Sequence, residues 1–196
     1  MPLDAPEMLE ALDAKLLVEA FPAALRRSAS VAAALVAKQL YSRQWTERFE
    51  VKVGGENLRI PSRLYLASHD LTALGEDKVR RLAACLHSRS NDGYQRQAAL
   101  RNLLREPAPW TATFVVALIG EYVIEMLGDI EAALSPRWLE ALTRFNAENP
   151  AYWQLTKQRV ASYWNCYYRY HPRGDYIGFR LIKKIEAAMR AFVPAG

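Results

Sequence analysis

The amino-acid sequence predicts a mostly α-helical fold: a single domain, residues 1–196, in which about eight helices form an orthogonal or stacked bundle with one β-hairpin. Apolar residues recur at intervals of three and four through most of the chain, which is typical of amphipathic helices. Prolines and helix-capping residues divide these stretches into segments of ordinary helix length. Only the segment near residues 48–66 alternates apolar and polar residues with a period of two, which indicates strands.

The N-terminal part of the chain predicts two helices. Leucines recur at helical spacing within residues 3–20, and Pro22 ends that pattern because proline disrupts a helix interior. The next stretch, residues 23–42, is rich in alanine, the residue with the highest helix propensity. The first residues are acidic where a secretion signal carries Lys or Arg, so we expect no signal peptide.

Residues 48–66 predict the hairpin. Phe49, Val51 and Val53 alternate with charged residues, and the sequence GGEN that follows supplies turn chemistry before a return strand. Pro61 cannot donate a hydrogen bond to a ladder, so it marks a sheet edge or the end of pairing. Two strands alone are only marginally stable, and we therefore expect the hairpin to lie against the helices.

Beyond Asp70 every segment predicts a helix. Asn91 or Asp92 is the expected cap of one of them, because both side chains accept hydrogen bonds from a first helical turn. Ser135-Pro136 and Asn149-Pro150 each place a capping residue before a proline, which is the strong form of a helix start. The predicted helices cover residues 76–88, 91–104, 110–127, 136–147, 150–170 and 176–192.

The most apolar of these helices, residues 110–127, carries two carboxylates. Glu121 and Glu125 are four residues apart and would share one helical face. A buried carboxylate needs a partner, and Arg96 is one of several arginines on the preceding helices that can supply it. Three interpretations stay open: buried Glu–Arg pairs that fix helix register, pairs with the basic C-terminal helices, or an acid/base pair in a cleft.

No motif predicts a catalytic centre. Nucleophile elbows, phosphate loops and dinucleotide-binding glycine patterns are missing, and SHD at residues 68–70 fits a capping loop better than a catalytic fragment. The two cysteines, Cys85 and Cys166, are expected to be buried thiols of a cytoplasmic protein. His87 and His171 do not have the spacing to these cysteines that zinc sites usually show. We expect no catalytic residue, no cofactor and no metal. The longest apolar run is too short for a membrane span.

Residues 77–103 contain a partial motif. Asp92, Arg96, Ala99 and Leu103 follow a D-x3-R-x2-A-x3-L spacing, and this stretch resembles the inner helix of HEAT-type helical repeats. The resemblance implies helix-on-helix stacking of the kind found in scaffolds that bind partners, and it brings no catalytic residues. The segment 92–127 is also similar to a bacterial protein family without an assigned function, which adds no mechanism.

The positive charge of the chain is concentrated at its C-terminal end. Residues 150–196 hold eight basic and two acidic residues, a net charge of +6, whereas the remaining residues hold 18 basic and 19 acidic ones, a net charge of −1. Such asymmetry indicates an anionic partner, unless acidic neighbours inside the fold neutralise it. Lys183 and Lys184 on the last helix belong to this basic set.

The same segment contains YWNCYYRYH, residues 163–171, in which five of nine residues are aromatic. On a helix, Trp164 and Tyr168 are expected to face the core. The residues expected to reach a partner are Tyr163, Tyr167 and Tyr170 with the flanking Arg169 and Arg173. Core packing, a protein–protein patch and base stacking are the three alternatives for the rings.

The leading hypothesis is a non-catalytic helical protein-interaction module with a protein partner, and a homodimer is compatible with it. The alternative is binding of RNA or single-stranded DNA through residues 150–196, where cations contact phosphates and rings stack on bases. The third hypothesis is an enzyme of unknown class that uses Glu121 or Glu125.

Overall fold

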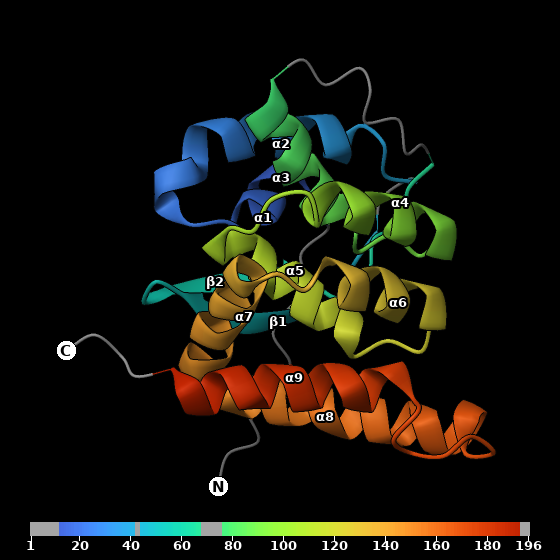
Figure 1. Ribbon diagram of the computed structural model, residues 1–196. Helices are drawn as coiled ribbons and strands as arrows, with labels where there is room; N and C mark the ends of the chain where they lie inside the picture. The colour runs from blue at the N-terminus through green and yellow to red at the C-terminus, as the bar shows by residue number, and fades with distance from the viewer. Residues whose placement is uncertain (1–11, 42–43, 68–75, 193–196) are drawn as a thin grey trace, which may run out of the picture.

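The computed structural model describes residues 12–41, 44–67 and 76–192, and these contain nine α-helices and one two-stranded antiparallel sheet (Figure 1). The fold class predicted from the sequence, a mostly helical bundle with one hairpin, is confirmed. The predicted start of the first helix and the SHD segment lie outside the described residues. In chain order the elements are α1 (Ala14–Val18), the 3₁₀ turn η1 (Ala23–Leu25), α2 (Arg26–Ala37), β1 (Arg48–Val53), β2 (Glu56–Pro61), α3 (Asp77–His87), α4 (Gly93–Leu103), α5 (Pro109–Ile119), α6 (Ile124–Ala133), α7 (Pro136–Glu148), α8 (Pro150–Tyr163), the π-helical turn η2 (Trp164–Tyr168) and α9 (Ile177–Ala191).

The helices form layers on either side of α5. Helices α1 to α4 lie together above it in Figure 1, and α8 and α9 run as a pair below it. Residues 111–119 of α5 are all buried, because α4, α6, α7, α8 and the strand β1 contact this helix from different sides. A helix that is apolar on every face is typical of such a central position. Within the described residues, no helix combines the length and apolar character that a membrane crossing requires.

The predicted helix over residues 110–127 is wrong at its C-terminal half. Helix α5 ends at Ile119, Gly120 caps it, and α6 begins only at Ile124. Gly120 lies close to α8, since a Cβ atom at this position would be 3.4 Å from Cδ of Arg159. Apolar residues continue on both sides of the break, so the spacing of apolar residues in the sequence does not reveal it. Glu121 and Glu125 therefore do not share a helical face.

Helix α2 is also shorter than predicted, because the chain after it leaves the helix to pair with a distant segment. Leu40 forms an antiparallel bridge with Leu66, and the amide of Tyr41 donates to the carbonyl of Tyr65 over 2.9 Å. These tertiary hydrogen bonds replace the ones that another helical turn would have supplied. The segment that follows the hairpin is thereby tied to the end of α2.

The hairpin lies within the predicted segment, residues 48–66, with its strands at Arg48–Val53 and Glu56–Pro61. Val53 pairs with Glu56, and the connecting Gly54 and Gly55 have φ angles of 59° and 82°, the left-handed region that a tight two-residue hairpin turn requires. Val51, Val53, Leu58 and Ile60 form its buried face. The sheet lies against the helices, as expected, and Phe49 stacks on Tyr152 of α8 with ring centroids 4.9 Å apart.

Asn149 joins the hairpin to the α7–α8 junction. Its Oδ1 accepts a hydrogen bond from the amide of Lys52 over 2.7 Å, and its Nδ2 donates to the carbonyls of Lys52 and Phe145, both over 2.8 Å. Asn149 lies at the start of α8, as predicted, but the expected capping role of its side chain is wrong. The side chain makes no capping bond to α8 and instead pairs with the backbone of β1.

Candidate functional site

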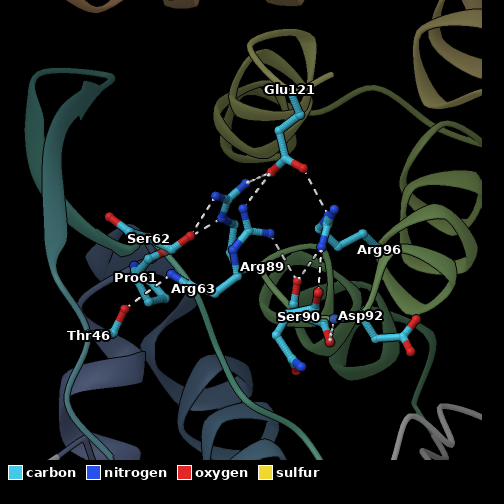
Figure 2. A network of polar contacts seen from close by, with 10 residues as sticks. Thr46, Pro61, Ser62, Arg63, Arg89, Ser90, Asp92, Arg96 and Glu121 are labelled. Carbon is cyan, nitrogen blue, oxygen red and sulfur yellow. Dashed lines mark hydrogen bonds and ion pairs between the residues drawn. The ribbon is translucent and has the colours of Figure 1, made fainter. Parts of the chain in front are cut away.

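Glu121 lies in the short connection between α5 and α6, where three arginines surround its carboxylate (Figure 2). Nε of Arg96 is 2.9 Å from Oε2, while Nη1 of Arg89 and Nη2 of Arg63 are 3.4 Å and 3.6 Å from Oε1. Glu121, Arg89 and Arg96 are each at most 8% exposed. We call these four residues the Glu121 cluster. A single carboxylate thus balances three guanidinium groups, of which two are buried.

The guanidinium groups of Arg89 and Arg96 also donate hydrogen bonds to backbone carbonyls. Arg89 donates to the carbonyls of Pro61 and Ser62, over 3.3 Å and 2.7 Å, and Arg96 donates to those of Ser90 and Asn91, over 2.9 Å and 3.0 Å. Burial lowers the pKa of Arg89, and the charge of Glu121 opposes that shift. The Glu121 cluster therefore ties the end of β2, the α3–α4 junction and the α5–α6 connection to one another. The Glu121 carboxylate is thus engaged in ion pairs within the fold.

Glu125 is exposed, so its expected burial beside Glu121 and Arg96 is wrong. It lies in the first turn of α6, beyond the break at Gly120 that separates it from the cluster. There it lines a shallow cavity of about 400 Å³ between α4 and α6. We call this the acidic cavity, because two of its side chains are carboxylates. Its lining residues are Asp92, Gly93, Tyr94, Gln97, Val123 and Glu125.

Four tyrosines form the second feature of this side of the molecule. The rings of Tyr122, Tyr163 and Tyr167 pack on one another with centroids 5.6–6.2 Å apart. Tyr163 is half-buried, Tyr167 is 61% exposed, and Tyr170, at the end of the helical segment, is 85% exposed. We call Tyr122, Tyr163, Tyr167 and Tyr170 the tyrosine surface. Tyr122 was not among the predicted contact residues, because the sequence indicates one unbroken helix over residues 110–127.

Two other aromatic residues of the π-helical turn η2, Trp164 and Tyr168, point toward the interior of the protein. The Tyr168 hydroxyl donates to the carbonyl of Tyr122 over 3.1 Å, and the Tyr168 ring stacks on Tyr176 at 5.1 Å. Trp164 packs edge-on against Phe179 of α9 at 5.8 Å. Both Trp164 and Tyr168 are partly buried against the core, which is the side the sequence assigned to them. π-Helical turns are rare and often occur at functional sites.

The basic residues of the C-terminal segment are partly neutralised within the fold. Lys157 forms an ion pair with Glu186 at 2.8 Å. Glu131 of α6 forms ion pairs with both Arg180 and Lys184, at 2.6 Å and 3.0 Å. Lys184, expected to contact a partner, is thus paired within its own chain although it is exposed, and Lys183 is exposed as well. The other two expected contact residues, Arg169 and Arg173, are exposed and lie over aromatic rings, at 5.4 Å from that of Tyr170 and 4.3 Å from that of Phe179.

Glu131 makes the stability of the protein dependent on acid pH. The hydrogen bond from Arg180 lowers the pKa of Glu131 from 4.5 to about 2. A lowered pKa contributes stability above pH 4.5 that is lost as the pH falls toward 2. We expect the free energy of unfolding of Glu131→Gln to lie below that of the wild type at pH 6, with the gap narrowing steadily toward pH 3. Urea titrations at several pH values measure it, and a gap independent of pH would contradict this role.

The cysteines and histidines do not come together. Cys85 and His87 are buried on α3, and burial raises the pKa of Cys85. Cys166 and His171 are exposed at the other end of the molecule, so the expected burial of Cys166 is wrong. The reason is that Trp164 and Tyr168 take the inward positions of η2. In the part of the chain that the structure describes, no group of three or more His, Cys, Asp or Glu side chains is arranged to hold a metal ion.

Comparison of the chain with protein-family models, with curated proteins and with solved structures finds no match. The function is therefore argued from the geometry of the Glu121 cluster, the acidic cavity and the tyrosine surface.

Proposed function

We propose that the protein is a non-catalytic helical interaction module that binds a protein partner through the tyrosine surface. The observation that carries the proposal is the packing of Tyr122 from the α5–α6 connection against Tyr163 and Tyr167 from the end of α8, a group in which Tyr122 and Tyr167 are exposed. Tyr and Arg are enriched at the energetic centres of protein interfaces, where a few large side chains provide most of the affinity.

The tyrosines are held in place before any partner binds. The Glu121 cluster fixes the connection that carries Tyr122, and the hydrogen bond from Tyr168 to the Tyr122 carbonyl joins that connection to η2. A side chain that is already ordered loses less conformational entropy on binding, which leaves more of the contact energy as affinity. This preorganisation supports a binding role for the surface.

Nucleic-acid binding is the less favoured alternative. Base stacking needs open ring faces, whereas Tyr122, Tyr163 and Tyr167 cover parts of one another. Two exposed carboxylates, Asp92 and Glu125, line the acidic cavity with Val123, the residue after Tyr122, and would repel phosphates. An enzyme based on Glu121 and Glu125 is also not favoured, because Glu121 is buried among arginines and Glu125 is exposed elsewhere.

The test is quantitative affinity capture with three forms of the full chain. The double variant Tyr167→Ser/Tyr170→Ser removes exposed rings of the tyrosine surface, and Tyr41→Ser/Tyr65→Ser removes two exposed rings elsewhere as the matched control. We expect the wild type and the control to recover the same protein, and the surface variant to recover it about tenfold less, which corresponds to about 1.4 kcal/mol.

Two results would contradict the proposal. One is equal recovery of every captured protein by all three forms. The other is capture that disappears after nuclease treatment, which would assign the surface to nucleic acid. Because Tyr167 and Tyr170 are exposed, the thermal midpoint of the surface variant should match that of the control, and this comparison shows that any loss concerns binding.

A further inference from the structure

We propose that the partner is a second copy of this chain, and that two copies form a symmetric dimer in which Arg169 and Tyr170 of each copy enter the acidic cavity of the other. This inference rests on the proposed function, because Tyr170 belongs to the tyrosine surface and Tyr122 of the same surface precedes Val123, which lines the cavity. We call Arg169 and Tyr170 the basic tip.

The acidic cavity has the chemistry to take a cationic side chain. The carboxylates of Asp92 and Glu125 line it, together with the ring of Tyr94, which is 87% exposed. One oxygen of Asp92 accepts the capping bond from the amide of Gln95 over 3.0 Å, which fixes the carboxylate at the start of α4. A guanidinium group binds carboxylates through paired hydrogen bonds and also stacks on aromatic rings. An arginine is therefore the side chain that this cavity fits best.

The basic tip supplies such a side chain. Arg169 and Tyr170 are both exposed, and the Arg169 guanidinium carbon lies 5.4 Å from the centre of the Tyr170 ring. Among the described residues Arg169 forms no ion pair, unlike Arg180 on the neighbouring helix, which binds Glu131. The tip thus presents an unpaired positive charge, which is complementary to the two carboxylates of the cavity, together with a large ring.

Cavity and tip lie on the same side of the molecule. Tyr168, next to Arg169 in the chain, donates to the Tyr122 carbonyl beside Val123, which lines the cavity. Burial raises the pKa of Tyr168, and the negative charge of Glu125 adds to this shift. In Figure 1, α4, α6 and the end of α8 all lie on the right-hand side.

This juxtaposition favours a second copy over an unrelated partner. In a two-fold symmetric interface the same patch occurs on both sides, so it has to carry both halves of every complementary contact. An unrelated partner would require only one half, either the tip or the cavity. Here one chain supplies both halves, with Tyr122, Tyr163 and Tyr167 between them as the apolar centre and the charges at the rim.

The experiment measures self-association of the full chain by sedimentation velocity over a range of concentrations. We expect the wild type to form a dimer, and both Arg169→Glu and Glu125→Arg to weaken it at least about tenfold, because each places like charges together in both contacts of the dimer. Lys183→Glu, the same charge change at an exposed position on α9, is the matched control and should dimerise as the wild type does.

Mixing the two charge variants provides the sharpest test. In a heterodimer of Arg169→Glu with Glu125→Arg, one contact pairs the two exchanged charges and the other contact is native. Native mass spectrometry should therefore detect heterodimer at concentrations where neither variant forms its own dimer. A mixture that stays monomeric while the wild type dimerises would overturn the proposal, and so would dimers unaffected by the single charge changes.

A wild-type chain that remains monomeric at the highest concentration tested would also overturn the dimer. The proposed function would survive that result if Tyr167→Ser/Tyr170→Ser still lost a captured protein that the Tyr41→Ser/Tyr65→Ser control retained. The two proposals therefore fail under different observations.

Discussion

Replacing Glu121 by glutamine should lower the free energy of unfolding by about 3–5 kcal/mol, because it leaves the buried Arg89 and Arg96 without their counter-charge. Removing one partner of a buried ion pair is costly since the remaining charge is neither solvated nor neutralised. For a protein of this size each kcal/mol lowers the thermal midpoint by about 2–4 °C. Urea and thermal unfolding measure the effect directly.

Glu125→Gln is the matched control, since it makes the same chemical change at an exposed position only four residues away. It should alter stability by less than about 0.5 kcal/mol. If Glu121→Gln does not yield folded protein, Arg63→Gln tests the same network at its edge. The Arg63 side chain is 36% exposed and its Nη2 is 3.6 Å from Glu121, so we expect a loss of about 1 kcal/mol or less. A Glu121→Gln protein as stable as Glu125→Gln would contradict a structural role for Glu121.

Replacing Asn149 by alanine should destabilise the protein by about 2–4 kcal/mol. The change removes three hydrogen bonds and leaves the amide and carbonyl of Lys52 and the carbonyl of Phe145 without these partners. Because these bonds join the hairpin to the α7–α8 junction, the loss should be largest for the sheet. Urea unfolding provides the free energy, and amide hydrogen exchange of residues 48–61 shows whether the strands open first.

Two variants accompany Asn149→Ala. Asn57→Ala removes an exposed amide within the hairpin itself and should change stability by less than about 0.5 kcal/mol. Asn149→Asp keeps the acceptor for the Lys52 amide but turns the donor toward two carbonyls into a second acceptor, so it should also destabilise. Equal stability of Asn149→Ala and Asn57→Ala would show that the side chain of Asn149 does not hold the hairpin.

The elements that local sequence determines were predicted well. The hairpin turn depends on two glycines with positive φ, and α4 and α7 start where Asp92 and Ser135 cap them. These signals act over a few residues and are therefore visible in the sequence. The break at Gly120 is different, because apolar residues continue on both sides of it and no local pattern marks it.

The candidate site shows the same division. The inward direction of Trp164 and Tyr168 follows from one helical segment and was expected from the sequence, whereas the sequence left open whether Tyr167 and Tyr170 are exposed, as they are in the structure. Tyr122 and the acidic cavity were missed, because they arise where α4, the α5–α6 connection and the end of α8 meet. Such a meeting is a tertiary property: Arg96 of α4 pairs with Glu121 of the α5–α6 connection, and Tyr168 at the end of α8 donates to the Tyr122 carbonyl of the same connection.

The central claim is that the tyrosine surface is buried when the protein binds its partner. Hydroxyl-radical footprinting of side chains tests it most directly, by comparing the dissociated protein with the complex it forms. We expect oxidation of Tyr122, Tyr167 and Tyr170 to fall in the complex, while that of Tyr41 and Tyr65, exposed elsewhere, stays unchanged. Unchanged oxidation of the first three tyrosines in a complex that demonstrably forms would contradict the account.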